Sequence, residues 1–313
     1  MNRRTLLRTI AVAGSTSLAG CETVLYGKEG NETVATANSE LAEAAAILNK
    51  IDLTANEEAN VSPGDFEGYS PSDVTQHTDV ANEALTDDDS DTGHVLSVVS
   101  TVLEETAYQY QSIEHVFGNI AEYRQRYLDR EFENAIRAGD RFATSLAEVT
   151  EHANIITENL VSLDDAGYNA PVEGFSVERW ANEQGVILRM AEAMTPLGVG
   201  FVRHANGMRV QQNAIVAKRD RDYQTALQEA EEAKNSFETA EENFSASLDL
   251  GFSQHRVLIE QFSCLAGGFF RGAETSVDAL EAYNDGDDNK GDNLWEQAIS
   301  EIEQVNDDCL SGE

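Results

Sequence analysis

Residues 94–120 read HVLSVVSTVLEETAYQYQSIEHVFGNI. Apolar side chains recur in this stretch every three or four positions, as they do on one face of an α-helix. The members of the stripe are Val95, Val98, Val99, Val102, Leu103, Tyr110, Ile113, Phe117 and Ile120. The stretch contains no proline and a single glycine, Gly118, so we expect a long helix that extends to Ala138.

The same periodicity fills most of the chain, and alternating β-branched runs separated by tight turns are scarce. We expect further helices at 33–53, 71–85, 140–160, 176–194, 197–218, 221–250, 252–283 and 293–309. Linkers are expected near 54–72 and 86–93, and Gly139-Asp140 reads as a helix stop and restart. The sequence therefore predicts an all-α protein of about seven to nine helices, in an antiparallel bundle or in stacked helical hairpins.

Short segments repeat the same spacing of aromatic and small residues. Residues 222–227 (DYQTAL) and 293–299 (NLWEQAI) share it, and 139–142 (GDRF) is a poorer third copy. This spacing resembles the second helix of a tetratricopeptide hairpin. The resemblance implies stacked hairpins, although the closing proline of that family follows none of the copies.

The first residues resemble an export signal. Arg3 and Arg4 precede a short apolar segment, and Leu18-Ala19-Gly20 leads into Cys21. The arginine pair is similar to a twin-arginine signal, and the small residues before the cysteine are similar to a lipobox. The resemblance to exported lipoproteins implies that 1–20 are removed and that Cys21 carries a membrane lipid. Residues 21–32 then form a tether, 33–313 form the helical domain, and the protein is held at the outer face of the cell membrane.

Acidic residues dominate the chain. Removing the three arginines of the signal from 21 Lys+Arg leaves 18 against 57 Asp+Glu, a formal charge of −39. Such self-repulsion largely disappears at about 1 M salt, where the screening length is about 3 Å. High acidity with only five lysines resembles haloarchaeal proteins, in which twin-arginine lipoproteins are common. Binding to nucleic acid is excluded, because the chain has no basic patch to neutralise phosphates.

Two cysteines remain once Cys21 is lipidated. Outside the cytoplasm Cys264 and Cys309 are free to form a disulfide. Closing a loop of about 45 residues would stabilise the fold by roughly 4 kcal/mol. The alternative is two buried free thiols.

One acidic segment resembles a calcium-binding EF-hand loop. In residues 285–296 oxygen donors stand at the first, third, fifth and twelfth places: Asp285, Asp287, Asn289 and Glu296. Lys290 stands where the family has glycine, and Asp292 where it has an apolar residue. Calcium binding is one interpretation, and a chance run of acids in an acidic chain is the other. We expect no other cofactor.

The sequence favours no enzyme, because we find none of the nucleotide-binding, zinc or nucleophile-elbow motifs. Asn31 and Asn243 head glycosylation sequons. We expect Tyr108, Tyr110, Tyr123 and Tyr127 to pack between helices, and Gly267, Gly268 and Gly272 to let two helices cross closely.

Two functions fit these observations. The first is a non-catalytic, lipid-anchored interaction or scaffolding protein that binds other envelope proteins in high salt. The second is a solute- or ligand-binding lipoprotein that serves a membrane transporter or receptor. A deep cavity lined by polar and aromatic groups would favour the receptor.

Overall fold

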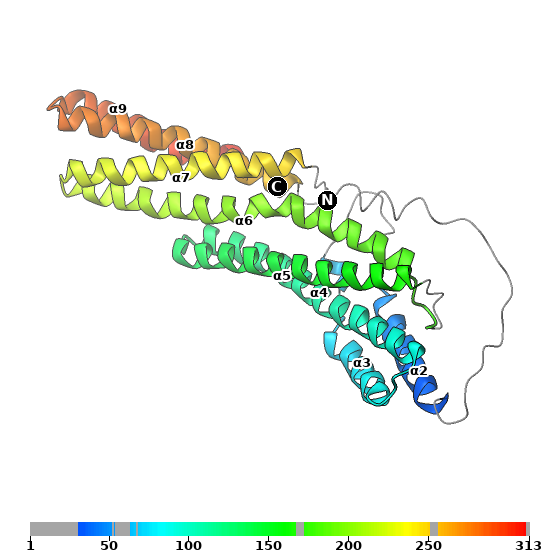
Figure 1. The fold of residues 1–313 in the computed structure, drawn as a ribbon. Coiled ribbons are helices and arrows are strands. Elements are labelled where there is room, and N and C mark those ends of the chain that lie inside the picture. Colours follow the sequence, from blue (N-terminus) through cyan, green and yellow to red (C-terminus); the bar gives the residue numbers. More distant parts are fainter. Residues whose placement is uncertain are drawn as a thin grey trace. The chain divides into compact units, whose positions relative to one another are not determined.

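The computed structural model describes residues 31–51, 53, 63–66, 68–166, 172–250 and 256–310. These residues form eight α-helices and one 3-10 helix, and they contain no strand, which confirms the all-α prediction (Figure 1). The elements are α2 (Asn31–Leu48), η1 (Pro63–Phe66), α3 (Pro71–Leu85), α4 (Asp91–Leu128), α5 (Phe132–Asp165), α6 (Val177–Arg219), α7 (Tyr223–Asp249), α8 (Arg256–Asn284) and α9 (Asp288–Leu310).

The chain divides into two compact units, and the division falls within the three longest helices. Unit 1 takes its described residues from the chain up to Glu114 and from Ala147–Met190. Unit 2 comprises His115–Leu146 and Ala191–Glu313. The predicted helical domain 33–313 extends over both units.

Unit 1 joins α2, α3 and the first part of α4 to parts of α5 and α6. Phe66 of η1 packs edge-on against Tyr110 of α4, with ring centroids 5.5 Å apart. Tyr69 donates a hydrogen bond of 3.0 Å to the carbonyl of Ala107. These contacts hold η1 and Tyr69 against α4.

Unit 2 contains three helix ends with the same turn. A residue with left-handed backbone ends α4, α6 and α8, and the next helix begins two residues later. These residues are Arg130 (φ 60°), Arg221 (φ 62°) and Gly286 (φ 80°). In each turn the following N–H bonds the carbonyl five residues back, which is the Schellman pattern: Glu131 to Arg126, Asp222 to Ala217 and Asp287 to Ala282.

The predicted break at Gly139 is wrong, because the chain turns at Arg130 instead. Gly139 lies inside α5, where a β carbon would come 2.9 Å from Cγ2 of Val202 on α6. The glycine therefore serves close helix packing and not a helix end. The turn was missed because arginine seldom adopts a left-handed backbone.

Residues 176–194 and 197–218 were expected as two helices, but they form the single helix α6 with Pro196 inside it. Proline removes one backbone hydrogen bond from a helix interior. Met194 and Leu197 on either side are almost completely buried, so packing holds the helix through that position.

The tetratricopeptide resemblance rests on local spacing alone. Both helices of such a repeat fit in about 34 residues, whereas α6 by itself has 43. Helix α6 alone is therefore longer than a whole repeat of that family.

Candidate functional site

Histidine 204 lies at the centre of unit 2. It is 0% exposed and has ring centroids of aromatic side chains within 6.2 Å on several sides. We call this group the His204 cluster: Tyr123, Tyr127, Phe201, His204, Phe237, Phe244, Phe262 and Phe269. Helices α4, α6, α7 and α8 each contribute two of its members. Four helices therefore pack together at this cluster.

The cluster holds a single side-chain hydrogen bond that involves His204. Tyr123 Oη lies 3.0 Å from Nδ1 of His204, and Nε2 of the same ring is buried without a partner. Burial lowers the pKa of His204 to about 3, so the ring is neutral at neutral pH. Burial likewise raises the pKa of Tyr123 well above its usual value. The pair is a neutral hydrogen bond, and it offers no charge for acid–base chemistry near pH 7.

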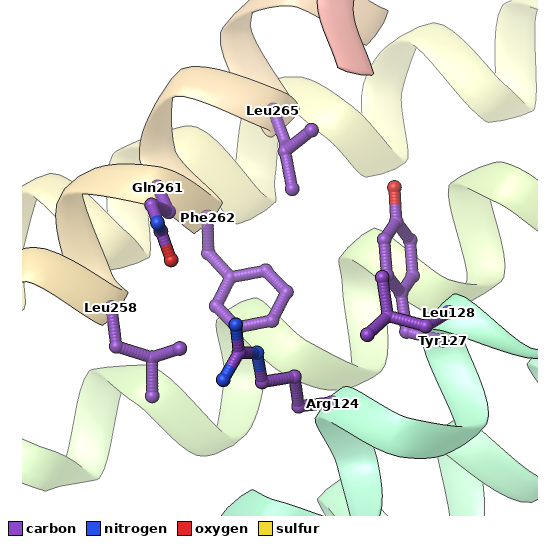
Figure 2. A pocket seen from close by; sticks show the side chains of 7 residues that line it. All are labelled: Arg124, Tyr127, Leu128, Leu258, Gln261, Phe262 and Leu265. Atoms are coloured by element: carbon purple, nitrogen blue, oxygen red, sulfur yellow. The ribbon is translucent and has the colours of Figure 1, made fainter. Parts of the chain in front are cut away.

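A pocket opens beside the cluster, and Figure 2 shows the side chains that line it. Its volume is about 80 Å³. The lining residues come from the end of α4 and the start of α8: Arg124, Tyr127, Leu128, Leu258, Gln261, Phe262 and Leu265. Tyr127 and Phe262 belong to the His204 cluster as well, and their rings lie 6.0 Å apart. The pocket is thus a mainly apolar hollow lined by two aromatic side chains, three leucines and two polar side chains.

A second aromatic group lies at the turn between α6 and α7. The rings of Tyr223 and Tyr283 stack in parallel with centroids 4.7 Å apart. Nζ of Lys218 lies 5.2 Å from the ring of Tyr283 and 5.1 Å from that of Trp295. Because Lys218 occupies these aromatic faces itself, the group stabilises the turn and leaves no cation site open.

Unit 1 contains a buried polar layer. Tyr110 of α4 donates a hydrogen bond to Glu183 of α6, whose side chain is 1% exposed. Gln109 and Gln184 exchange two hydrogen bonds of 2.8 and 3.0 Å. Burial, followed by the charge of Glu183, raises the pKa of Tyr110 well above its usual value. Paired polar groups of this kind fix the register of two helices.

The predicted disulfide is present. Sγ of Cys264 on α8 and Sγ of Cys309 on α9 are bonded, and their Cα atoms lie 5.8 Å apart. The expected close helix crossing lies beside it. A β carbon on Gly268 would come 2.5 Å from Cγ2 of Val305, and one on Gly272 would come 2.5 Å from Cγ1 of Ile302. The glycines and the disulfide together hold α9 against α8.

Of the two interpretations of residues 285–296, the structure does not show the loop that calcium binding needs. Asp285 and Asp287 lie in the turn after α8, whereas Asn289 and Glu296 lie within α9, which begins at Asp288. An EF-hand needs its donors on one twelve-residue loop that wraps the ion, and a helix from the fourth position onward prevents that arrangement. In the described part of the chain no three His, Cys, Asp or Glu side chains gather to hold a metal.

The sequon at Asn243 lies within the C-terminal half of α7. The side-chain amide of Asn243 donates a hydrogen bond of 2.7 Å to the carbonyl of Thr239, and Phe244 beside it is completely buried. This geometry disfavours glycosylation of the folded chain. Asn31 is the first residue of α2, and its side chain lies outside the described residues, as do Arg3, Arg4 and Cys21.

Three of the four tyrosines expected between helices are buried. Tyr110, Tyr123 and Tyr127 are at most 6% exposed, whereas Tyr108 is 37% exposed. Tyr108 instead stacks on the ring of His152 at the surface of unit 1.

Helix α6 is long and apolar enough to cross a membrane, but 61% of its most apolar window is buried inside the protein. A core helix of a soluble protein has the same composition, so this helix is weak evidence for a membrane span.

Comparison with known proteins adds no relative. No protein-family model, no curated protein and no solved structure matches the chain. What the protein does must therefore be argued from its own residues.

Sequence reasoning missed His204, Glu183 and the pocket. Glu183 gives a signal in retrospect, because it stands three residues after Trp180 and four before Ile187, in line with buried apolar positions. A polar residue inside an apolar stripe indicates a buried hydrogen bond. The pocket gives no such signal, since its walls come from segments more than a hundred residues apart.

Proposed function

We propose that the protein is a non-catalytic interaction or scaffolding protein, anchored by lipid at Cys21 to the outer face of the cell membrane and adapted to high salt. The export signal, the lipobox-like cysteine and the acidic composition support its location. The disulfide between Cys264 and Cys309 is consistent with that location, because such bonds persist outside the cytoplasm.

The size of the pocket is the observation that favours a scaffold over a solute receptor. Sites for small molecules usually enclose about 300–1,000 Å³ with convergent polar groups. The pocket in unit 2 has about 80 Å³ and mainly apolar walls. It has room for one side chain of a partner, and this favours protein binding over solute binding.

Three buried titratable groups contribute to the structure of the two units. His204 is kept neutral by burial, and Tyr110 and Glu183 are enclosed between helices. Catalysis needs reactive groups that a substrate can reach. These groups contribute rigidity, which lowers the entropic cost of presenting a binding surface.

Reversible chemical cross-linking of intact membranes in molar salt, followed by purification of the tagged protein, tests the proposal. We expect a defined envelope protein to be cross-linked to the wild type and to a Cys264→Ser variant alike. A Cys21→Ala variant should be released from the membrane and lose the cross-link. Two results together would favour the receptor instead. The protein would form no cross-link in this assay, and one compound of a solute panel would raise its melting temperature.

A further inference from the structure

Helix α9 packs along α8 in unit 2, and both helices are acidic (Figure 1). Its sequence carries seven acids against one lysine, a formal charge of −6. Helix α8 has four acids against two arginines, and α7, which packs on α8 as well, has seven acids against one lysine. Three neighbouring helices therefore repel one another wherever salt does not screen their charges.

The polar contacts of α9 leave most of this charge in place. No ion pair between described side chains joins α9 to another helix. Two of its carboxylates accept hydrogen bonds from neutral hydroxyl groups of α8, Asp292 from Tyr283 at 2.5 Å and Glu301 from Thr275 at 2.8 Å. A neutral donor holds a carboxylate in position but does not cancel its charge.

Packing and one covalent bond hold α9 in place against this repulsion. Val305 and Ile302 lie on Gly268 and Gly272 of α8, where the two backbones approach closely. Toward the other end of α9, Trp295 and Ala298 are buried. The disulfide from Cys264 to Cys309 lies one turn beyond Val305. The attachment of α9 thus combines a repulsion that depends on salt with a bond that does not.

Helix α7 carries the same charge but is attached more firmly. It contributes Phe237 and Phe244 to the His204 cluster, and both are completely buried. The members of that cluster come from α4, α6, α7 and α8, so α9 takes no part in it. Among the acidic helices of unit 2, α9 is therefore the one that repulsion separates most easily.

We propose that α9 is a salt-sensitive strap. It lies on α8 in molar salt and is the first helix of unit 2 to detach as the salt concentration falls, while the disulfide keeps Cys309 beside α8. The screening length is about 3 Å at 1 M salt and about 30 Å at 0.01 M, whereas packed helices lie about 8–10 Å apart. Dilution therefore exposes α8 and α9 to each other's charge. This inference goes beyond the interaction function, because it concerns charge and packing within unit 2 alone.

Hydrogen exchange followed by mass spectrometry tests the strap on the full chain, because it reports the protection of α8 and α9 separately. Wild type and a Cys264→Ser/Cys309→Ser variant are compared as potassium chloride is lowered from about 3 M to about 0.1 M. Both proteins should protect α9 in molar salt and lose its protection before that of α8. The variant should lose it at a salt concentration about twofold higher than the wild type does. Returning the wild type to molar salt should restore the protection.

Matched charge variants show whether the charge of α9 itself is responsible. Glu296→Gln/Glu303→Gln removes two exposed carboxylates from α9 and should lower the salt concentration at which α9 detaches. Asp87→Asn/Asp89→Asn makes the same change in net charge at exposed positions before α4, in unit 1, and should leave that concentration unchanged. Circular dichroism in molar salt checks the fold of each variant.

Three results would overturn the strap. Loss of protection in α8 and α9 at one and the same salt concentration would make α9 an inseparable part of the core. Equal effects of the two charge variants would assign the response to the net charge of the chain. Loss of α9 in molar salt on removal of the disulfide would show that the bond holds it there and that salt does not. None of these results depends on the membrane cross-linking that tests the proposed function.

Discussion

Phe244 on α7 occupies the space that a side chain at Gly200 on α6 would need. A β carbon on Gly200 would lie 2.5 Å from Cε1 of Phe244, closer than real atoms approach. The same contact recurs seven residues further along α6 and seven residues earlier on α7. There a β carbon on Gly207 would lie 2.7 Å from Cε1 of Phe237. Two antiparallel helices thus pack ring against glycine at heptad spacing, and this places both phenylalanines in the His204 cluster.

Replacing Gly200 by alanine should therefore destabilise the protein. The added methyl forces Phe244 out of a well-packed position, and overpacking of this kind costs about 1–3 kcal/mol. Denaturant unfolding in molar salt measures the effect.

Gly118 supplies the control, because it lies inside α4 with nothing within 4 Å of its missing side chain. Gly118→Ala should raise the free energy of unfolding by about 0.5–1 kcal/mol through helix propensity. If both variants became more stable, the packing of Phe244 on Gly200 would be disproved.

The disulfide between Cys264 and Cys309 should contribute to stability, because it closes a loop with a sequence separation of 45. On the loop-entropy estimate a Cys264→Ser variant loses roughly 4 kcal/mol. Thermal melting without reductant should show the loss. Reductant should lower the melting temperature of the wild type and leave the variant unchanged, and a reductant effect of equal size on both would contradict this account.

His204 should make the fold sensitive to acid. Its pKa is about 3 in the folded state against an ordinary value of 6.5. As the pH falls below 6.5 the unfolded chain takes up a proton that the folded chain refuses. The free energy of unfolding should therefore fall by about 1.4 kcal/mol per pH unit, an effect that is complete near the folded pKa.

A Tyr123→Phe/His204→Phe double variant removes this term without leaving the tyrosine hydroxyl unpaired. The difference between wild type and variant, measured by denaturant unfolding from pH 7.5 to 4.5, should change with that slope. The exposed His115→Gln is the matched control. Parallel pH profiles of wild type and double variant would show that His204 accepts a proton in the folded protein.

The left-handed turns should respond in opposite ways to substitution. Arg130→Gly and Arg221→Gly relieve a backbone conformation that disfavours side chains, so each should stabilise by about 0.5–1 kcal/mol. Gly286→Ala should destabilise by about 1 kcal/mol. Arg219→Gly, in the last turn of α6, is the control and should destabilise the helix. Destabilisation by Arg130→Gly equal to that by Arg219→Gly would argue against the left-handed backbone.

The helices could be predicted because the buried face of a helix requires an apolar residue every three or four positions, and the sequence shows this spacing directly. The stripe from Val95 to Ile120 lies in α4, and the helix at 71–85 was predicted with its observed bounds. The disulfide could be predicted too, because few cysteines leave few pairings.

The turns and the pocket could not be predicted, because they depend on contacts that the local sequence pattern does not show. Arg130 is held left-handed by the hydrogen bonds of the turn, and Gly139 stays helical because Val202 packs on it. Tyr127 and Phe262 meet in the pocket although 135 positions separate them in the chain. Such meetings follow from the packing of whole helices, which periodicity alone does not specify.

The covalent link between α8 and α9 also bears on what a protease can release from the protein. A single cut anywhere between Cys264 and Cys309 leaves both pieces joined through the sulfur atoms. The cut part of α9 stays beside Gly268 and Gly272 of α8, where it can pack again. Cleavage in this segment therefore does not by itself release any fragment from the protein.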